Sequence, residues 1–571
     1  MTSVPAPDDE GARAAGVLAP EAAMFTDNDP ALLGQALTAA ARAATRSPLA
    51  ATSLTLQLGE RLWSAGTATM SRLAGRTAEG PMPTDARDKR FTDPAWEENP
   101  AFWGLRQAYL AWRQYGLDLL HAADLDRVQE SKAQLAFSFL HDALSPTNFA
   151  PTNPAVLKRA LETGGRSLVD GWRNFVDDLV HNNGRPRQVD TTPFEVGRNL
   201  ACTPAKVVYR NDLIEVLQYL PQTERVHEVP VLCSPPWINK YYVMDLAPGR
   251  SFIEWAVQHE RTVFAISYRN PDASMANTTM DDYLVKGPRA AMDVISEITG
   301  ADRIDFVGLC LGGALTMMTA TYLDEVGDDR LNSITLLNTM VDYADPGALG
   351  TFTDEETVAK LERRMQRRGY LEAKDMVGTF DILRANDLIF NYVVANWLMG
   401  KQPPAFDILA WNGDATRMPA AMHSFYLRNF YMQNNFVKGG LQVRGQTLDL
   451  GDVDQDLYIV SAINDHIVPW TSSYATLKHI SGDARFVLSS GGHIAGIVNP
   501  PSPKAWYVTG EQYPEDPQQW RSGGERHAGS WWEDWAAWGA KRSGPLTEPP
   551  PVGSDMHPVL GDGPGDYVKE S

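Results

Sequence analysis

The residue best suited to chemistry in this chain is Cys310, in the pattern Gly308-Leu309-Cys310-Leu311-Gly312. An apolar run over 304–308 precedes it, and a helical pattern begins at Leu311. A G-x-S-x-G turn between a strand and a helix exposes a nucleophile, and here sulfur replaces oxygen. The start of a helix favours the reactive thiolate. We therefore predict that Cys310 is a nucleophile; the alternative is an inert cysteine buried in a tight turn.

An acid and a histidine follow in the order that a catalytic triad requires. Asp465 comes directly after the strand pattern over 457–461. His493 comes 28 residues later, after a strand pattern over 485–488 and a Gly-Gly pair. The order nucleophile, acid, histidine is that of the α/β-hydrolase fold. We predict that His493 is the base for Cys310 and that Asp465 is its partner.

His466, next to Asp465, is the rival base among eleven histidines. Side chains of neighbouring residues in an extended or turn segment point in different directions, so we assign His466 a supporting role. Asp465 has an alternative as well, because an Asn-Asp pair also suits a turn.

Backbone N–H groups can stabilise the oxyanion that forms when the nucleophile attacks a carbonyl. The residue after the nucleophile, Leu311, supplies the first such N–H. A second is expected in the loop after the strand pattern over 229–233, from Trp237 or Ile238, because the two preceding prolines have no N–H. The alternative is an ordinary surface loop.

A sulfur nucleophile indicates thioester chemistry. Attack on an acyl-CoA by Cys310 gives another thioester, so the acyl group stays activated for transfer to an alcohol. Such a transferase must exclude water from the intermediate. Aromatic residues in the segment after the strand pattern over 334–337 could line a dry cavity: Phe380, Phe390, Tyr392, Trp397, Trp411 and Phe425. The alternative is that they only pack this segment.

The composition excludes several classes of function. The chain has 571 residues and a formal net charge of −20, which argues against a nucleic-acid partner. Three cysteines make a disulfide framework unexpected, and no Cys/His cluster has the spacing of a zinc site, so we expect no metal. The start of the chain lacks the basic and apolar runs of a signal peptide, and no apolar run is long enough to be a transmembrane segment. We expect a cytoplasmic protein.

Composition and hydropathy pattern divide the chain into four regions. Residues 1–30 are expected to be disordered, 31–195 to form a helical N-terminal domain, and 196–545 to form the catalytic domain. Strand patterns alternate with helical ones in the catalytic domain, as in a mostly parallel sheet. A helical cap is expected over about 342–449, and a flexible Pro- and Gly-rich tail over 546–571. The predicted fold is an α/β-hydrolase fold with an inserted helical cap, preceded by a helical domain.

Several motifs together resemble those of the polyhydroxyalkanoate synthases. The resemblance runs from about residue 90 to 545. The motifs are Phe91-Thr92-Asp93-Pro94-Ala95-Trp96, Asn148-Phe149-Ala150-Pro151-Thr152-Asn153-Pro154, Pro235-Pro236-Trp237-Ile238-Asn239-Lys240-Tyr241-Tyr242, Gly308-Leu309-Cys310-Leu311-Gly312-Gly313, Thr416-Arg417-Met418-Pro419-Ala420-Ala421, Asp465-His466-Ile467-Val468-Pro469-Trp470, Gly492-His493-Ile494-Ala495-Gly496 and Gly529-Ser530-Trp531-Trp532.

The resemblance implies polymerisation of (R)-3-hydroxyacyl-CoA into polyester with release of CoA. Cys310 would carry the acyl chain and His493 would act as its base. Asp465 would orient His493 or help to activate the 3-hydroxyl of the next monomer. His466 and Trp411 fall on positions that the family shares. No cofactor is implied, since CoA is part of the substrate and is a product.

The resemblance also implies a type and a location. Chain length and the cap stretch Trp411–His423 resemble the single-subunit, class I-like synthases, which favour short-chain monomers such as 3-hydroxybutyryl-CoA. The family implies a homodimer at the surface of a growing polyester granule. The alternatives are a Cys-His-Asp hydrolase of the thioesterase or dienelactone hydrolase type, and a non-catalytic granule-associated protein.

Overall fold

The computed structural model describes residues 48–85 and 88–570, together with Gly34, Thr38, Arg42 and Thr45. The disorder expected for 1–30 lies outside these residues, as does the side chain of Phe380. The chain forms two compact units. Among the described residues, those up to 190 and those over 375–405 form the first unit, and those over 191–374 and 406–570 form the second.

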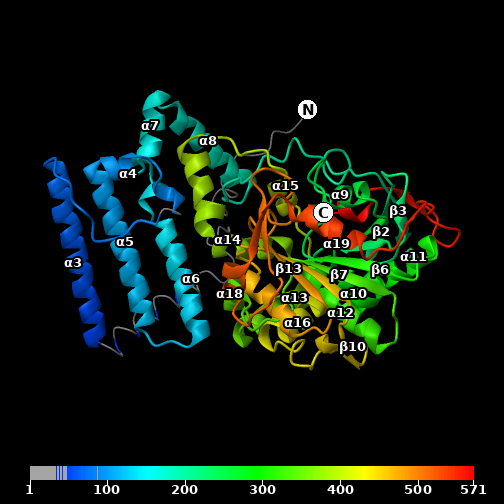
Figure 1. The fold of residues 1–571 in the computed structure, drawn as a ribbon. Helices are drawn as coiled ribbons and strands as arrows, with labels where there is room; N and C mark the ends of the chain where they lie inside the picture. The colour runs from blue at the N-terminus through cyan, green and yellow to red at the C-terminus, as the bar shows by residue number, and fades with distance from the viewer. Residues whose placement is uncertain are drawn as a thin grey trace. The chain divides into compact units, whose positions relative to one another are not determined.

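The first unit is helical, as predicted for the N-terminal region. Its helices are α3 Pro48–Leu73, α4 Ala95–Glu98, α5 Pro100–His121, α6 Arg127–Ala143, α7 Pro154–Glu162, α8 Arg166–His181 and most of α14 Ala373–Leu383. The Asn99 side chain caps α5 by accepting the Ala101 N–H at 2.9 Å. Helices α3, α5 and α6 run side by side (Figure 1). Tyr109 on α5 bonds the His141 Nδ1 on α6 at 2.8 Å, which joins two of these helices in the core.

Part of the segment predicted as a cap belongs to this helical unit. Residues 375–405 pack with the N-terminal helices. The Phe390 ring lies 5.8 Å from the Phe139 ring, and the Trp397 Nε1–H donates to Asp178 at 2.8 Å. Phe390 and Trp397 therefore pack against N-terminal helices, and their predicted role in lining a dry cavity stays a prediction.

The second unit is built on one large mixed sheet. Within the described residues the strand order is β15-β14-β13-β12-β7-β6-β4-β5-β2-β1-β17. Neighbours from β5 through β4, β6, β7 and β12 to β13 are parallel, and the outer pairs are antiparallel. In this order the bounds are Glu525–Ala528, Trp506–Thr509, Ala484–Ser489, Asp456–Ala462, Leu331–Leu337, Ile304–Leu309, Val231–Ser234, Val263–Tyr268, Ile214–Tyr219, Ala205–Arg210 and Gly561–Asp562.

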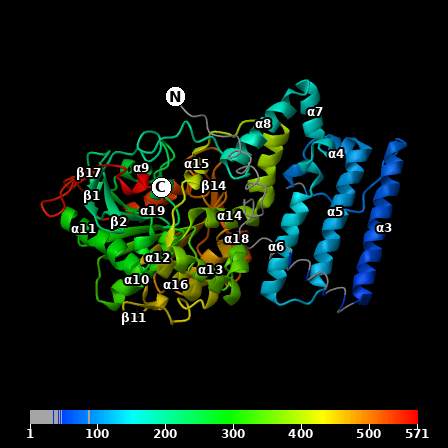
Figure 2. The ribbon, with the colours of Figure 1, turned by 180° about the vertical axis from the view of Figure 1, so that it is seen from behind.

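Helices cover both faces of this sheet. Helices α9 (Phe252–Gln258) and α19 (Trp531–Ala540) lie on one side, and α10 (Met280–Leu284) and α12 (Leu311–Glu325) lie on the other (Figures 1 and 2). The rings of Phe252 and Trp535 pack at 4.7 Å between α9 and α19. The central strands are buried on both faces, which explains why they read as continuous apolar runs. The fold is the predicted α/β-hydrolase fold.

Strand β2 was missing from the sequence prediction. It carries Glu215 and Gln218, which interrupt the apolar run, yet all six of its residues are buried. Tertiary contacts satisfy both side chains. Glu215 pairs with Arg210, and Gln218 donates to the Pro551 carbonyl at 2.9 Å. A buried polar residue with a distant partner is invisible to a hydropathy pattern.

The remaining insertion within the second unit mixes helices with short strands. Its elements are α13 Glu355–Arg368, β8 Tyr370–Leu371, α15 Asp407–Gly413, β9 Met418–Pro419, α16 Ala420–Tyr426, η10 Leu427–Met432, β10 Gln442–Val443 and β11 Gln446–Thr447. Strands β8 and β9 pair with each other, as do β10 and β11. The sequence predicted helices and loops here and missed both strand pairs, which are too short to produce an alternating pattern.

The tail is held along the sheet, in contrast to the mobile tail expected from its composition. Strand β16 (Leu546–Thr547) pairs with β3 (Val226–His227), and β17 extends the main sheet beside β1. The Asp566 and Tyr567 N–H groups donate to the Glu215 carboxylate at 3.0 Å each.

Candidate active site

Cys310 stands at a strained turn between β6 and α12. Its φ is 53° and its ψ is −115°, an unusual backbone conformation for a residue with a side chain. The Cys310 N–H donates to the Leu337 carbonyl at 2.8 Å, which ties the turn to β7. A Cβ on Gly308 would lie 2.5 Å from the Gly313 Cα, so this turn requires glycine where the strand meets the helix. The geometry is the predicted elbow.

His493 and Asp465 meet at the ends of neighbouring strands β13 and β12. The His493 Nδ1 lies 2.6 Å from the Asp465 Oδ2, and the Asp465 side chain is fully buried. The other carboxylate oxygen of Asp465 accepts the N–H groups of Ile467 at 2.8 Å and Val468 at 2.9 Å. The carboxylate is therefore fixed in orientation and fully hydrogen-bonded.

The charges around His493 favour its protonated form. Burial acts to lower the pKa of His493, but the Asp465 carboxylate and the Cys310 thiolate act to raise it, and hydrogen bonds to both add to this effect. The result is a pKa of His493 well above its ordinary value. Because Nδ1 is engaged by Asp465, Nε2 is the ring nitrogen left for Cys310.

The main chain of His493 is also anchored. The Asn338 side-chain amide donates to the His493 carbonyl, and the Asn338 N–H donates to the Val460 carbonyl at 2.8 Å. Asn338 follows β7 and has a φ of 43°. Strands β7, β12 and β13 thus share one fixed junction beside Cys310.

The structure brings Asp465 to His493 and not to His466. Both oxygens of the Asp465 carboxylate are taken by His493 and by the N–H groups of Ile467 and Val468. His466 is half-buried in the same loop. Its supporting role stays a prediction.

The predicted oxyanion donors lie on two segments in close contact. Leu311 begins α12, and Trp237 and Ile238 lie in the loop after β4. A Cβ on Gly312 would lie 2.2 Å from the Ser234 carbonyl oxygen, so the loop and the helix start touch through backbone. Thr416 holds the loop, with its Oγ1 donating to the Trp237 carbonyl at 2.9 Å. The donation of these N–H groups to an oxyanion stays a prediction.

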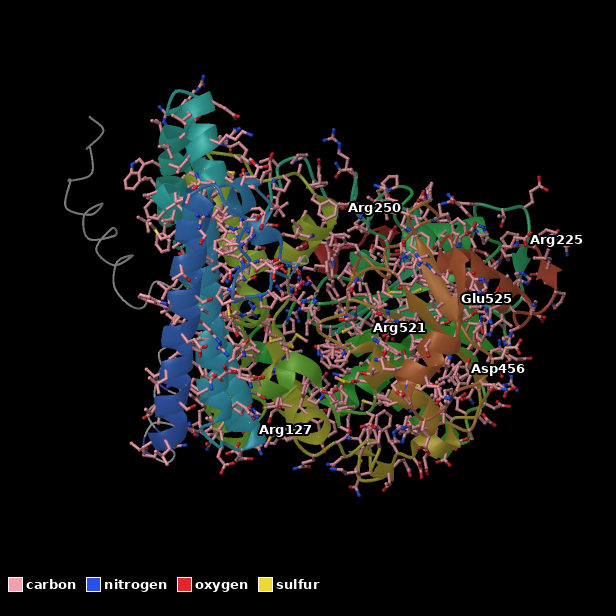
Figure 3. All side chains as sticks on the ribbon, turned by 60° about the vertical axis from the view of Figure 1, so that its left-hand side comes forward. Arg127, Arg225, Arg250, Asp456, Arg521 and Glu525 are labelled. Atoms are coloured by element: carbon pink, nitrogen blue, oxygen red, sulfur yellow. The ribbon has the colours of Figure 1, made fainter. Side chains whose placement is uncertain are left out.

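Trp411 contacts this loop from the insertion. It is 4% exposed, and its Nε1–H donates to the Lys240 carbonyl at 2.8 Å. Its helix, α15, is held by Arg250, which is labelled in Figure 3 and lies 2.5 Å from an oxygen of Asp407. Trp411 thus bonds the loop after β4, and its supporting role stays a prediction.

The sequence analysis did not identify three tyrosines close to Cys310: the buried Tyr343 and Tyr426, and the half-buried Tyr431. Burial is the main cause that raises the pKa of each phenol, and the nearby Cys310 thiolate adds to it. The Tyr343 and Tyr426 hydroxyls are 2.8 Å apart, and the Tyr426 ring packs edge-on against Trp237 at 5.6 Å. We refer to these three residues as the tyrosine cluster.

The spacing of the tyrosine cluster explains why it was missed. Tyr343 follows β7, whereas Tyr426 ends α16 and Tyr431 lies five residues later in a π-helical turn over Leu427–Met432. Such a turn places residues five apart on one side, which a search at the α-helical period does not group. No signal in the sequence alone joins Tyr343 to the other two.

The described residues contain no group of three or more His, Cys, Asp or Glu side chains arranged to hold a metal ion. They also contain no helix with the length and apolar character needed to cross a bilayer.

Comparisons with known proteins agree on one family. Residues 87–256 match the family described as poly-beta-hydroxybutyrate polymerase (PhaC) N-terminus, and residues 239–500 match the alpha/beta hydrolase fold. A poly(3-hydroxyalkanoate) polymerase subunit PhaC of Rhizobium meliloti is 40% identical over 512 residues, which cover 89% of this chain and 83% of the relative.

A second relative and a solved structure complete the comparison. The corresponding subunit of Cupriavidus necator is 41% identical over 504 residues, which cover 86% of this chain and 84% of the relative. An esterase structure from Exiguobacterium antarcticum is 12% identical, with a TM-score of 0.29, and covers 51% of this chain and 92% of that one. On the identity and coverage of its relatives, this chain belongs to the poly(3-hydroxyalkanoate) polymerase family of polyester-synthesising acyltransferases.

Proposed function

We propose that this enzyme polymerises (R)-3-hydroxyacyl-CoA through a thioester on Cys310 and releases CoA. The observation that carries the proposal is the His493 imidazole, whose Nδ1 lies 2.6 Å from the Asp465 Oδ2 and whose pKa is raised by the neighbouring Asp465 carboxylate and Cys310 thiolate. A histidine in that position prepares the thiolate and can return the proton. The relatives named as poly(3-hydroxyalkanoate) polymerases support the choice of substrate class.

The acylation step follows from these positions. The Cys310 thiolate attacks the thioester carbonyl, and the new oxyanion accepts N–H groups of Leu311 and of Trp237 or Ile238. The bond from carbonyl carbon to the CoA sulfur breaks, and CoA leaves as a thiol after taking the proton of His493. The acyl group is then held on Cys310 as a thioester.

In chain extension, His493 accepts a proton, whereas in the acylation step it donates one. The hydroxyl oxygen of a second acyl group attacks the Cys310 thioester and loses its proton to the His493–Asp465 pair. An ester bond forms and Cys310 is released as a thiolate. No cofactor is needed, because CoA enters as part of the substrate and leaves as product.

The surroundings of Cys310 support transfer over hydrolysis. Two members of the tyrosine cluster, Tyr343 and Tyr426, are buried, and the buried Trp237 packs against Tyr426. A dry, aromatic site disfavours attack by water on the intermediate. The cap stretch Trp411–His423, which resembles class I-like synthases, leads us to propose a short-chain monomer such as 3-hydroxybutyryl-CoA.

We also propose that the enzyme is a cytoplasmic homodimer that acts at the surface of a polyester granule. The exposed apolar side chains of α8 support the granule contact: Leu168, Val169, Trp172, Val176 and Val180. We call these five residues the α8 apolar face. An apolar polymer surface would cover such a face.

The test of the function uses purified protein and (R)-3-hydroxybutyryl-CoA. Free CoA thiol and turbidity should rise together, and Cys310→Ala should abolish both. Cys202→Ala and Cys233→Ala are matched controls that should keep both. CoA release without polymer would instead identify a hydrolase. The same assay with longer 3-hydroxyacyl chains tests the monomer preference.

Thiol labelling separates an activated cysteine from an inert one. Burial raises the pKa of Cys202 and of Cys233, so both should react slowly with iodoacetamide at pH 7. Cys310 should react faster, and His493→Gln should slow it about tenfold or more by removing the cation beside the thiolate. Equal labelling of Cys310 with and without His493 would favour the non-catalytic alternative.

A further inference from the structure

The loop over 235–240 contains the predicted oxyanion donors Trp237 and Ile238, and we call it the oxyanion loop. It also carries a buried ammonium group. Lys240 follows Trp237 and Ile238 by a few residues and is 2% exposed. Its Nζ donates to the backbone carbonyl of Glu570 and lies 3.5 Å from that of Tyr567. Burial lowers the pKa of Lys240, while the carboxylates of Asp414 and Glu570 oppose that effect. The hydrogen bonds of this cation therefore come from the end of the tail.

The tail is seated firmly enough to hold those carbonyls in place. Glu215 on β2 is fully buried and accepts the N–H groups of Asp566 and Tyr567 at 3.0 Å each. Gly565 has a φ of 85°, and a Cβ there would lie 2.3 Å from the Glu215 carboxylate. The Asn270 N–H donates to the Glu570 side chain at 3.1 Å. The tail backbone thus packs directly against the Glu215 side chain.

The other side of the loop is held by the insertion. The Lys240 carbonyl accepts the Trp411 Nε1–H at 2.8 Å, and the Ile238 carbonyl accepts the Thr416 N–H at 3.1 Å. The Lys240 side chain reaches the tail while its backbone reaches α15. The loop is therefore clamped between two segments, and Lys240 bonds both.

We infer that tail residues 566–570 are a positioning part of the active site, which holds the oxyanion loop in place through Lys240. The inference rests on the proposed function, in which Trp237 or Ile238 donates to the oxyanion. It assigns a catalytic consequence to a segment far from Cys310 in the chain.

The physical reason is the penalty of a buried charge without partners. Removing the two carbonyls leaves the Lys240 ammonium desolvated and short of hydrogen-bond acceptors. The side chain then moves toward water or loses its proton, and the loop over 237–240 shifts with it. A methionine side chain has a similar length and no charge, so Lys240→Met should remove the need for the tail.

The experiment compares four proteins: the full chain, a truncation that ends at Asp566, Lys240→Met, and the two changes together. Lys206→Ala in the full chain is a control, since it removes the exposed ion pair between the tail residue Asp562 and β1. One readout is kcat and KM for CoA release. The other is hydrogen exchange of the segment 237–243, with β4 as the internal reference.

The truncation should lower kcat on the order of 10- to 100-fold with little change in KM, as for the loss of an oxyanion donor. Exchange over 237–243 should speed up while β4 stays protected. In the Lys240→Met background, the truncation should change kcat and the exchange rate over 237–243 by less than about threefold, as expected for coupled sites. Lys206→Ala should behave as the full chain.

Equal losses on truncation with and without the Lys240→Met substitution would overturn the inference. So would a truncated protein that unfolds in both backgrounds, because the tail would then serve folding itself. If the full chain releases no CoA from 3-hydroxybutyryl-CoA, the proposed function fails. The exchange comparison still tests the coupling of loop and tail in that case.

Discussion

At the scale of single residues, the proposed triad depends on a carboxylate whose orientation is fixed by its hydrogen bonds. The Asp465 carboxylate accepts from His493 and from two backbone N–H groups, so it has little freedom to rotate. That bond fixes Nδ1 as the nitrogen facing the carboxylate and leaves Nε2 for Cys310. The proton affinity of the imidazole depends on both neighbours.

Asp465→Asn tests this arrangement directly. An amide in place of the carboxylate removes the charge that raises the pKa of His493 and can present an N–H to Nδ1, which favours the wrong tautomer. We expect kcat to fall about 10³-fold or more, by analogy with triads that lose their acid. The measurement is the steady-state rate of CoA release.

Asp454→Asn provides the matched control, because Asp454 is exposed and lies close to β12. It should leave the rate within about twofold of the unchanged enzyme, as expected for an exposed substitution. An Asp465→Asn variant that keeps a tenth of the rate would contradict the proposed role of the acid.

At the scale of elements, the site depends on backbone surfaces that touch. The start of α12 lies against the loop after β4, and glycine at 312 allows this contact. Cys310, with its strained φ of 53°, lies where β6 meets the start of α12. Elements packed this closely leave no room for an added methyl group.

Gly312→Ala should therefore disable the site with only limited effect on the fold. The new Cβ would lie 2.2 Å from the Ser234 carbonyl oxygen, which forces the helix start and the loop apart. We expect kcat to fall at least about tenfold, since both predicted oxyanion donors move. Circular dichroism and CoA release measure the two effects.

Gly523→Ala is the comparison for that variant. A Cβ on Gly523 meets no atom within 4 Å, so activity and melting temperature should stay unchanged. Full activity in Gly312→Ala would show that the contact between α12 and the β4 loop can relax at no catalytic cost.

A second junction in the same unit is held by the buried carboxyl of Asp245. Burial raises the pKa of Asp245 to about 7, although hydroxyls of Thr203, Ser251 and Tyr219 bond it and act in the opposite direction. Ser251 donates at 2.8 Å and also caps α9. In the folded protein this carboxyl keeps its proton to a higher pH than in the unfolded chain, where the ordinary value is 3.8.

The raised pKa of Asp245 makes the folded protein less stable as the pH rises. As pH rises from about 4 to 7, the unfolded state releases the proton first, so Asp245 lowers the free energy of unfolding by up to about 4 kcal/mol. Asp245→Asn lacks this titration. Its stability relative to the unchanged protein should rise over that pH window and level off above pH 7. Urea unfolding at several pH values measures the difference, and parallel curves would contradict the assignment.

At the scale of the whole molecule, the proposed reacting groups belong to one unit and the exposed apolar side chains of α8 belong to the other. The proposed triad, the predicted oxyanion loop and the tail all belong to the second unit. The α8 apolar face belongs to the first, and its Trp172 is 65% exposed. This division agrees with a proposed role for the helical unit at the polymer surface.

Substitution of the α8 apolar face should weaken granule binding. Full burial of a large apolar side chain contributes about 1.5–3 kcal/mol, so Trp172→Ser with Val176→Ser should reduce binding at least about tenfold. The measurement is the fraction of protein that sediments with washed polyester particles. Arg173→Ser is a control, since its exposed side chain lies on the same helix. Unchanged sedimentation of the double variant would exclude this face as the contact.

Local patterns allowed much of this protein to be predicted. The elbow around Cys310 requires an apolar strand directly before it and glycines on either side of it. These residues are adjacent in the chain, so the sequence predicts the elbow. Asp465 and His493 each follow a buried strand, and parallel strands end at one edge of a sheet. Periodicity likewise indicated the central strands and the N-terminal helices, because a side chain that faces a core repeats with its element.

Only the tertiary structure decided the features that depend on distant partners. Strand β2 is buried because Glu215 meets the tail, and residues 375–405 join the helical unit because Trp397 meets Asp178. The tyrosine cluster assembles residues from three segments, and Lys240 is satisfied by carbonyls more than three hundred residues away. The sequence by itself identified the candidate reacting groups and determined the strands that they follow, since those signals are local. Long-range packing decided what surrounds them, because a buried polar group reveals its partner only once the chain has folded.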